Sequence, residues 1–411
     1  MKKLYFIVLS LFTLTACHKD EERPSIPEMA DRTVMVYMSA ENNLSGFAQS
    51  DINEMTTGYQ DVSNNNTNLV IFVDRAITNE KPFIGRITKN KMNPVDTLYQ
   101  YTTDIVAADP SIYKDVIKRI AGLCPAKSYG LVLWGHANGW IIENQQASAP
   151  RRAYGVDSES DIGGKELWLN IPDMRSAMEE LPFKWKFIFC DCCNMQNVEL
   201  AYEWKDVTEY IIAAPSEITG IGAPYDNIVK DLFYTNDEAM YKGICDGYYN
   251  QVTQEMHQGD EHMPISTVKT CAMQQLADAT RLILPRVAEY IAQPDAMTGL
   301  IYYYNILKEK PIKDDIMYDM NNVIQNALQD DPTSYANWKN AFDQAVIYSQ
   351  KSMYWHTNAV ALSRITETID KQGVMSMFFP LAKYAKGYHK YNTDIKKMKW
   401  YQAVGWSEVG W

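Results

Sequence analysis

Two residues of this chain could together carry out nucleophilic catalysis. His136 follows an apolar run at 129–134, and Cys193 follows a second apolar run at 185–190. A thiol becomes a nucleophile when a nearby imidazole takes its proton, so such a pair could cleave an acyl bond through a thioester. Each residue also has a simpler interpretation: the histidine could be a structural hydrogen-bonding group and the cysteine could be core filling. The two residues alone leave both interpretations open.

The pattern between residues 32 and 240 predicts the elements that would position this pair. Apolar runs alternate with helical segments, which is typical of a parallel sheet covered by helices on both faces, the α/β doubly wound class. Such sheets bind ligands beyond the carboxyl ends of their strands, where His136 and Cys193 would lie. A helix expected just after Cys193 would lower the pKa of its thiol through the helix dipole. Strands are expected at 33–38, 68–74, 129–134, 185–190 and 210–214, a hairpin at 82–101, and helices at 43–55, 109–123, 171–181 and 197–204.

The sequence changes in character after about residue 240. Long helical patterns replace the regular alternation, and short strand candidates lie between them. We therefore expect a catalytic domain at 32–240 and a mixed α+β, helix-rich domain at 241–411, with the many aromatic residues as core. The helices are expected at 274–291, 312–328 and 334–350, and the strands at 265–270, 359–364 and 374–379.

The composition excludes some classes of protein. With 46% hydrophobic and 22% charged residues, the chain is globular. Its net charge of −12 argues against nucleic acid as a partner, because phosphate binding needs clustered Lys and Arg. An inverted zinc-protease motif is approached at His257–His262, but its spacing is wrong by one residue, and we expect no metal there.

The N-terminus predicts an exported lipoprotein. A basic start precedes an uncharged run at 4–16, which is too short to span a bilayer and suits a signal peptide. The run ends in Leu14-Thr15-Ala16-Cys17, which resembles the bacterial lipobox, so residues 1–17 would be the signal and Cys17 the lipidated residue. The alternative is an ordinary secretory signal. The charged segment 18–31 is then a tether, similar to those that place lipoproteins on the outer membrane and the cell surface.

Several segments together resemble the clostripain family of cysteine peptidases, which share the caspase–gingipain α/β core. The resemblance implies that His136 is the catalytic histidine and Cys193 the nucleophile, acting on peptide or protein substrates. Cys193 matches the family position because it lies two residues after Asp191 and two before Met195. The matching segments are Val34-Met-Val-Tyr-Met-Ser-Ala-Glu-Asn-Asn-Leu44, Leu131-Val-Leu-Trp-Gly-His136, Asp191-Cys-Cys-Asn-Met195, Val198-Glu-Leu-Ala-Tyr-Glu203 and Ala214-Pro-Ser-Glu217, with weaker matches at 375–380 and the C-terminus.

The resemblance also implies roles for the neighbours of the pair. The backbone N–H groups of Ala137 and Cys193 would bind the oxyanion. Relatives commonly cleave after Arg or Lys, and Asp191 would be the carboxylate that selects these side chains, with Glu217 and Asp226 as second acids. The alternative for Asp191 is a cap on the following helix.

The resemblance also has implications for processing and for cofactors, and the chain differs from the usual family pattern at two positions. Relatives are cut in a loop between the catalytic strands, and the basic pair in that loop predicts self-cleavage after Arg152. Calcium supports some relatives, although no run of ligands in this sequence indicates it, and no other cofactor is expected. The family typically has Gly after the histidine and a small residue before the cysteine, where this chain has Ala137 and Cys192. These departures favour the alternative function, a surface-anchored binding or scaffold protein that keeps the peptidase fold.

Overall fold

A computed structural model describes residues 28–411 apart from 78, 143–153, 158–166, 253–262, 308–312, 358–360, 365–368 and 386–390. The predicted lipidation site at Cys17, the predicted cleavage site at Arg152 and the His257–His262 motif lie outside the described residues. Within them, no helix has both the length and the apolar character needed to cross a bilayer.

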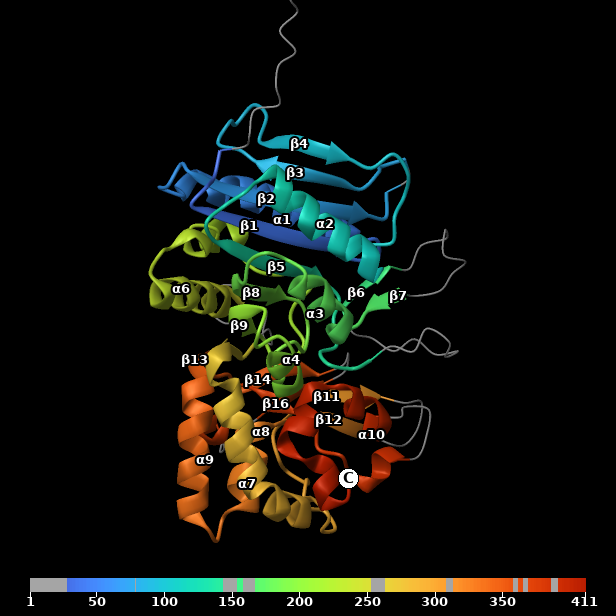
Figure 1. Cartoon of the computed structure of the whole chain (residues 1–411), viewed down its shortest axis with the longest axis vertical. Coiled ribbons are helices and arrows are strands. Elements are labelled where there is room, and N and C mark those ends of the chain that lie inside the picture. Colours follow the sequence, from blue (N-terminus) through green and yellow to red (C-terminus); the bar gives the residue numbers. More distant parts are fainter. Residues whose placement is uncertain are drawn as a thin grey trace, which may run out of the picture.

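A large mixed sheet of nine strands forms the centre of the described structure (Figure 1), in the order β13-β10-β9-β8-β5-β1-β2-β3-β4. Its middle, from β9 to β2, is parallel, and the strands at both edges are antiparallel. The strands are β1 (Arg32–Ala40), β2 (Thr67–Arg75), β3 (Phe83–Ile87), β4 (Val95–Gln100), β5 (Tyr129–Gly135), β8 (Trp185–Asp191), β9 (Thr208–Ala213), β10 (Ile265–Lys269) and β13 (Val346–Gln350).

Alternate residues of β1 enter two separate hydrophobic cores. Val34 and Val36 pack with α1 and α6 on one face, while Met35 and Tyr37 pack with α2 and α3 on the other. Successive side chains of a strand point to opposite faces, so this division means that the sheet is covered on both sides. The predicted doubly wound α/β fold is therefore confirmed. The helices around the sheet are α1 (Ser45–Gly58), α2 (Pro110–Leu123), α3 (Ile171–Glu179), α4 (Val198–Glu203), α5 (Tyr225–Ile228) and α6 (Asp237–Asn250).

Most of the chain from α7 onward lies below the large sheet in Figure 1, apart from β13, which joins that sheet. Here a three-stranded sheet, β11-β12-β16, lies among helices, and β14 pairs with β15. Near β1 and β5, β6 (Tyr154–Asp157) and β7 (Leu167–Leu169) form a separate pair. The remaining elements are α7 (Met273–Ile291), β11 (Tyr302–Leu307), β12 (Lys313–Asp319), α8 (Met320–Ala327), α9 (Pro332–Ala345), β14 (Tyr354–Thr357), β15 (Ala361–Arg364), β16 (Ser376–Met377), α10 (Tyr391–Asp394) and α11 (Lys399–Val404).

Two predicted helices are wrong in part. The segment 312–328 begins as strand β12 before it becomes α8, and the segment 334–350 ends as strand β13. β13 pairs with β10, and β12 pairs with β11 and β16, so partners distant in sequence decide these conformations. A boundary after residue 240 would cut α6 and separate β10 and β13 from the sheet that they extend. The predicted division therefore does not follow the large sheet.

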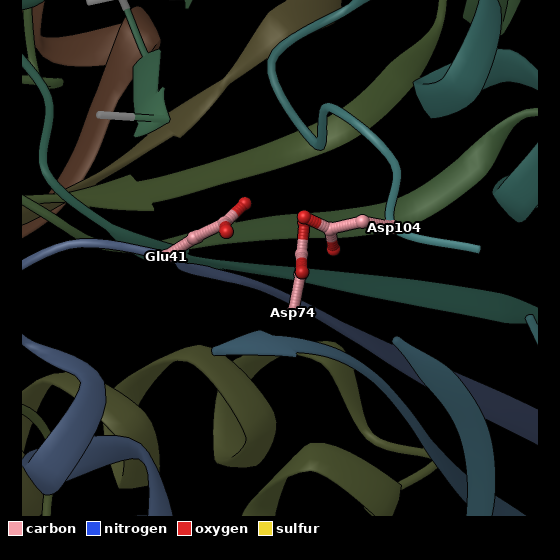
Figure 2. Close-up of side chains that lie close together, drawn as sticks. All are labelled: Glu41, Asp74 and Asp104. Atoms are coloured by element: carbon pink, nitrogen blue, oxygen red, sulfur yellow. The ribbon is translucent and has the colours of Figure 1, made fainter. Parts of the chain in front are cut away.

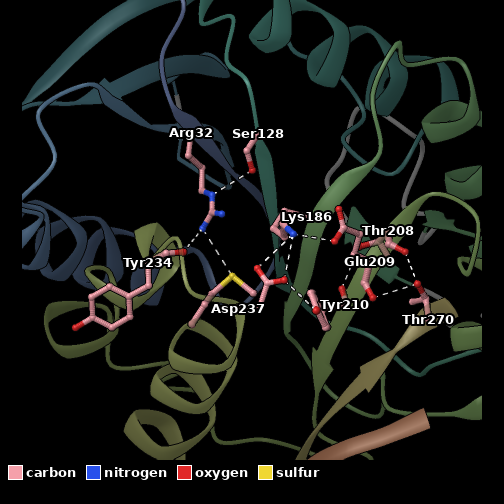
Figure 3. A network of polar contacts seen from close by, with 10 residues as sticks. Arg32, Ser128, Lys186, Thr208, Glu209, Tyr210, Tyr234, Asp237 and Thr270 are labelled. Atoms are coloured by element: carbon pink, nitrogen blue, oxygen red, sulfur yellow. Dashed lines mark hydrogen bonds and ion pairs between the residues drawn. The ribbon is translucent and has the colours of Figure 1, made fainter. Parts of the chain in front are cut away.

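A polar network fixes the edge of the sheet opposite the predicted site (Figure 3). Arg32 at the start of β1 donates to the carbonyls of Leu232 (3.0 Å) and Tyr234 (2.8 Å). Lys186 on β8 pairs with Glu209 on β9 (2.8 Å) and with Asp237, the first residue of α6 (3.3 Å). These contacts hold the beginning of α6 against the strands, and the helix then runs toward the other edge.

Candidate active site

The structure places His136 and Cys193 at matching positions beyond two adjacent strands. β5 and β8 are parallel neighbours, and Trp134 on β5 is in register with Asp191 on β8. Each predicted catalytic residue lies two positions further along its own strand. Gly135 has φ +140°, and a Cβ at this residue would come within 2.8 Å of the Ser39 carbonyl oxygen. Only glycine fits this close approach of the two backbone segments, and the left-handed conformation directs the chain to His136.

Asn43 holds the imidazole of His136. Its Oδ1 lies 2.6 Å from Nε2 of the histidine. Asn43 follows β1, the other hydrogen-bonded neighbour of β5, so both residues lie at the carboxyl edge of the sheet. An amide oxygen can only accept a hydrogen bond, so this contact favours a proton on Nε2 and leaves Nδ1 to exchange the proton of the thiol.

Cys193 is the accessible thiol of the three close cysteines. It is partly exposed, whereas Cys190 and Cys192 are buried. The backbone N–H of Ile218, just beyond β9, donates to the Cys193 sulfur at 3.4 Å, which favours the thiolate. Burial raises the pKa of the Cys192 thiol well above its ordinary value, and the neighbouring Cys190 adds to this effect. Cys192 is therefore unsuited to act as a nucleophile.

The helix expected just after Cys193 begins later. α4 starts at Val198, and its N-cap is Asn197, whose side chain accepts from the Leu200 N–H. Asn194 has φ +59° and forms part of a tight turn that separates the thiol from the helix. The predicted effect of the helix dipole on the Cys193 thiol is therefore replaced by the direct contact with the Ile218 N–H. Because Asn197 is the cap, Asp191 does not cap this helix.

Ala137 fits its position without backbone strain. The residues with positive φ in this segment are Gly135 and Gly139, not Ala137. Ala137 forms a bridge with Tyr154 of β6, and the Gly155 N–H donates to the His136 carbonyl at 2.8 Å. The departure from glycine therefore imposes no left-handed conformation on an alanine.

Asp191 lies in the interior and is held by three donors. Its carboxylate accepts from the hydroxyls of Tyr225 and Tyr248, each at 2.8 Å, and from the Ala223 N–H at 3.1 Å. Burial raises its pKa, and these donors act in the opposite direction. Tyr248 lies on α6, the helix that the polar network fixes at its other end.

Two acids of α1 lie close to Asp191, and sequence reasoning missed both. Burial, followed by the charge of Asp191, raises the pKa of Asp51 to about 8. Burial also raises the pKa of Glu54, and the charges of Asp226 and Asp191 add to it. The Glu54 carboxylate accepts from the Tyr225 N–H at 3.1 Å. The carboxyl groups of α1 and β8 therefore form an acidic region behind Cys193.

The structure places the two other predicted acids at different distances from this region. Glu217 is partly buried and adjoins Ile218, which contacts the Cys193 sulfur. Asp226 is exposed on α5 and reaches the region through its electrostatic effect on Glu54. Asn43 could have been found from the sequence, because it follows the strand expected at 33–38 and so had to lie at the same edge of the sheet.

Comparison with known proteins agrees with this geometry. Residues 36–411 match the clostripain family, Peptidase_C11. Clostripain of Hathewaya histolytica is 28% identical over 235 residues, which cover 50% of this chain and 43% of clostripain, so the chain matches less than half of that relative's length.

Two solved structures share the fold over 92% of this chain. One is a secreted C11 cysteine protease of Bacteroides thetaiotaomicron in complex with an irreversible peptide inhibitor, with 26% identity, 100% of its chain covered and a TM-score of 0.75. The other is an inactive zymogen C11 protease of Parabacteroides distasonis, with 24% identity, 99% of its chain covered and a TM-score of 0.73. The predicted caspase-like fold and the predicted class of enzyme, a cysteine-type endopeptidase, agree with these findings. The chain belongs to the clostripain family.

Proposed function

We propose that this protein is a cysteine endopeptidase that cleaves after Arg or Lys through a thioester on Cys193. One observation carries the proposal: His136 and Cys193 end adjacent parallel strands in register, and the histidine ring is held by Asn43. A histidine with only a structural role has no need of a partly exposed cysteine at the matching position of the next strand.

The chemistry follows from this arrangement. The Cys193 thiolate attacks the scissile carbonyl carbon, and the N–H groups of Ala137 and Cys193 stabilise the oxyanion. Protonated His136 gives its proton to the amine as the C–N bond breaks, which leaves an acyl thioester. His136 then takes a proton from water, the hydroxide attacks the thioester, and the thiol is released with the new carboxylate.

The acidic region supports a preference for basic side chains. Asp191, Asp51, Glu54 and Asp226 influence one another electrostatically, and their mutual repulsion together with burial raises the pKa values of Asp51 and Glu54. A Lys or Arg side chain of the substrate would relieve part of this repulsion. Asp191, which is buried at the end of β8, would select the cation, and Glu217 and Asp226 would contact it nearer the surface.

The anchored position of β6 supports self-cleavage after Arg152. Cleavage there would leave a new N-terminus at Ala153, next to Tyr154, whose hydroxyl donates to the Tyr37 (2.9 Å) and Trp134 (3.1 Å) carbonyls. The solved Parabacteroides distasonis relative is described as an inactive zymogen, which fits activation by processing. Purified Arg152→Gln protein should stay uncut on a denaturing gel, while the wild type yields a fragment that begins at Ala153. An uncut wild type with full activity would contradict this step.

We further propose that the protein is exported and anchored by lipid on Cys17, at the outer membrane and the cell surface. The secreted Bacteroides relative supports the export, and the lipobox supports the anchor. Cells fed a labelled fatty acid should label the wild type but not a Cys17→Ala variant. Surface exposure should show as sensitivity of intact cells to added protease.

Hydrolysis of fluorogenic peptides tests the activity. The wild type should release the fluorophore from peptides that end in Arg or Lys, and Cys193→Ala should abolish this release while Cys192→Ala leaves it. The two variants are a matched pair, because each removes the sulfur atom of one of two adjacent cysteines. If wild type and Cys193→Ala are equally silent after mild proteolytic activation, the scaffold alternative holds instead.

A further inference from the structure

The carboxyl edge of the large sheet contains a cluster of acids and, beyond β8, a loop that hydrogen bonds hold in place. The acids Glu41, Asp74 and Asp104 converge near the carboxyl ends of β1 and β2 (Figure 2), where their proximity disfavours ionisation. The loop is the segment 194–197, which directly follows Cys193. Because the position of the proposed nucleophile depends on this loop, the groups that hold it bear on catalysis.

Gln196 is fully buried in this loop. Its backbone N–H donates to the Ala214 carbonyl just beyond β9 at 3.0 Å, and its carbonyl accepts from the Ser376 N–H of β16 at 2.9 Å. Its side-chain amide donates to the carbonyl (2.6 Å) and to the hydroxyl (2.9 Å) of Ser266 on β10. The loop is therefore attached both to the large sheet and to β16.

The Ser266 hydroxyl connects Gln196 to a strained turn at residues 373–376. It accepts from the Gln196 amide and donates to the Val374 carbonyl at 2.6 Å. Val374 is fully buried and has φ +56°, a left-handed conformation that a β-branched residue rarely adopts. Such strain persists only where the surrounding structure imposes it, and it is concentrated at functional sites.

Asp319, at the end of β12, holds the strained turn from the other side. Its Oδ2 accepts from the Gly373 N–H at 2.8 Å and from the Val374 N–H at 3.1 Å. A Cβ at Gly373 would lie 2.7 Å from the Asn321 Cβ, so this close approach requires glycine. The buried carboxylate and the close approach together impose the conformation that brings the Val374 carbonyl to Ser266.

We propose that Val374, Ser266 and Gln196 form a connection that positions Cys193 for attack. The inference rests on the proposed function, since this position matters to catalysis only if Cys193 is the nucleophile. Gln196 is buried three residues after Cys193, so it is a positioning residue and not a catalytic one. A looser loop would move the sulfur relative to His136 and slow the reaction, because a misplacement of about 1 Å can cost about 100-fold in rate.

Ser266→Ala tests the connection, because it removes the hydroxyl that joins Gln196 to Val374. In steady-state kinetics with peptides ending in Arg or Lys, it should lower kcat about tenfold and change KM by less than about twofold. Ser266→Thr keeps a hydroxyl and should restore most of the rate. Gln196→Met should also lower kcat. The double variant should be no slower than Gln196→Met alone, because both residues act through one connection.

Thr280→Val is the matched control for the loss of a buried hydroxyl. The Thr280 hydroxyl of α7 accepts from the Trp338 ring N–H at 3.0 Å and donates to the Leu276 carbonyl at 2.7 Å. Its removal therefore breaks the same two kinds of hydrogen bond within the helices α7 and α9. Thr280→Val should lower the melting temperature about as much as Ser266→Ala does, and it should leave kcat unchanged.

Alkylation of Cys193 by iodoacetamide tests the same connection without peptide turnover. Ser266→Ala should slow this alkylation several-fold, because the shifted sulfur loses its contact with the Ile218 N–H, and Thr280→Val should not slow it. A wild type that cleaves no peptide would contradict the proposed function, and alkylation would then decide the inference alone.

Three results would overturn the inference. The first is a wild-type value of kcat or of the alkylation rate in both Ser266→Ala and Gln196→Met. The second is a loss of kcat or of alkylation rate in Thr280→Val as large as that in Ser266→Ala. The third is a Ser266→Thr protein that is no faster than Ser266→Ala.

Discussion

The Oδ1 atom of Asn43 lies 2.6 Å from Nε2 of His136 and links the segment after β1 to the proposed catalytic histidine just beyond β5. Because this oxygen accepts, it selects the ring tautomer that presents Nδ1 toward thiol chemistry. In the proposed mechanism Asn43 acts through the histidine and is therefore a positioning residue.

Asn43→Ala should lower kcat/KM about 10²-fold, since the ring loses its orientation but the nucleophile remains. Asn43→Asp should keep more activity than Asn43→Ala, because a carboxylate still accepts from Nε2. Its charge should also stabilise the imidazolium and shift the alkaline limb of the pH–rate profile to higher pH. The measurement is the pH profile of kcat/KM for all three proteins.

Asn53→Ala is the control, because Asn53 is exposed on α1 and lies outside the segment between β1 and that helix. It should match the wild type in rate and in pH profile. Equal activity of Asn43→Ala and Asn53→Ala would show that Asn43 does not position the histidine.

Thiol alkylation should separate Cys193 from the other cysteines. At neutral pH iodoacetamide should modify Cys193 faster than the exposed Cys271, because the Ile218 N–H and His136 favour the Cys193 thiolate. Burial raises the pKa of Cys245 to about 12 and that of Cys124 to about 11, so both should stay unmodified in the folded protein. Peptide mass spectrometry over time gives the rates. A rate for Cys193 no greater than that for Cys271 would mean that the thiol is not activated.

The sequence alone was sufficient to predict the central sheet and to place His136 and Cys193 beyond neighbouring strands. The parallel strands are buried on both faces, so they appear as apolar runs, and the ends of two such runs identify His136 and Cys193. β12 and β13 were mistaken for parts of helices because their conformation depends on pairing with distant strands. Local periodicity does not contain that information.

The acids were harder to interpret than the pair. Asp51 of α1 accepts from the Trp134 ring N–H of β5, and Glu54 accepts from the Tyr225 N–H, but only the folded chain shows which acids converge.

Gly222→Ala should weaken the binding of basic substrates. Gly222 has φ +76°, and a Cβ there would lie 3.0 Å from Oδ2 of Asp191 and 3.2 Å from Oδ2 of Asp51. The substitution should cost about 1–2 kcal/mol for the left-handed backbone alone, and it should displace the loop that covers Asp191. Steady-state kinetics should show a raised KM for peptides ending in Arg or Lys, while Cys193 alkylates at the wild-type rate.

Gly220→Ala is the matched control in the same loop, because its Cβ would meet only Phe47 at an ordinary 3.7 Å. It should leave KM unchanged. An unchanged KM in Gly222→Ala as well would argue against a role for this loop and Asp191 in recognising basic side chains.

Asp51→Asn should change how stability depends on pH. The pKa of Asp51 is about 8 in the folded protein, through burial and the charge of Asp191, and about 3.9 when unfolded. The folded state therefore retains a proton that the unfolded state loses, and the stability linked to that proton is complete below about pH 4 and declines as pH rises through about 8. Asparagine cannot ionise, so the free energy of unfolding of Asp51→Asn relative to wild type should increase across this range and then level off. Urea unfolding at several pH values measures this difference, with the exposed Asp61→Asn as control. A difference that stays constant with pH would mean that Asp51 is ionised in the folded protein.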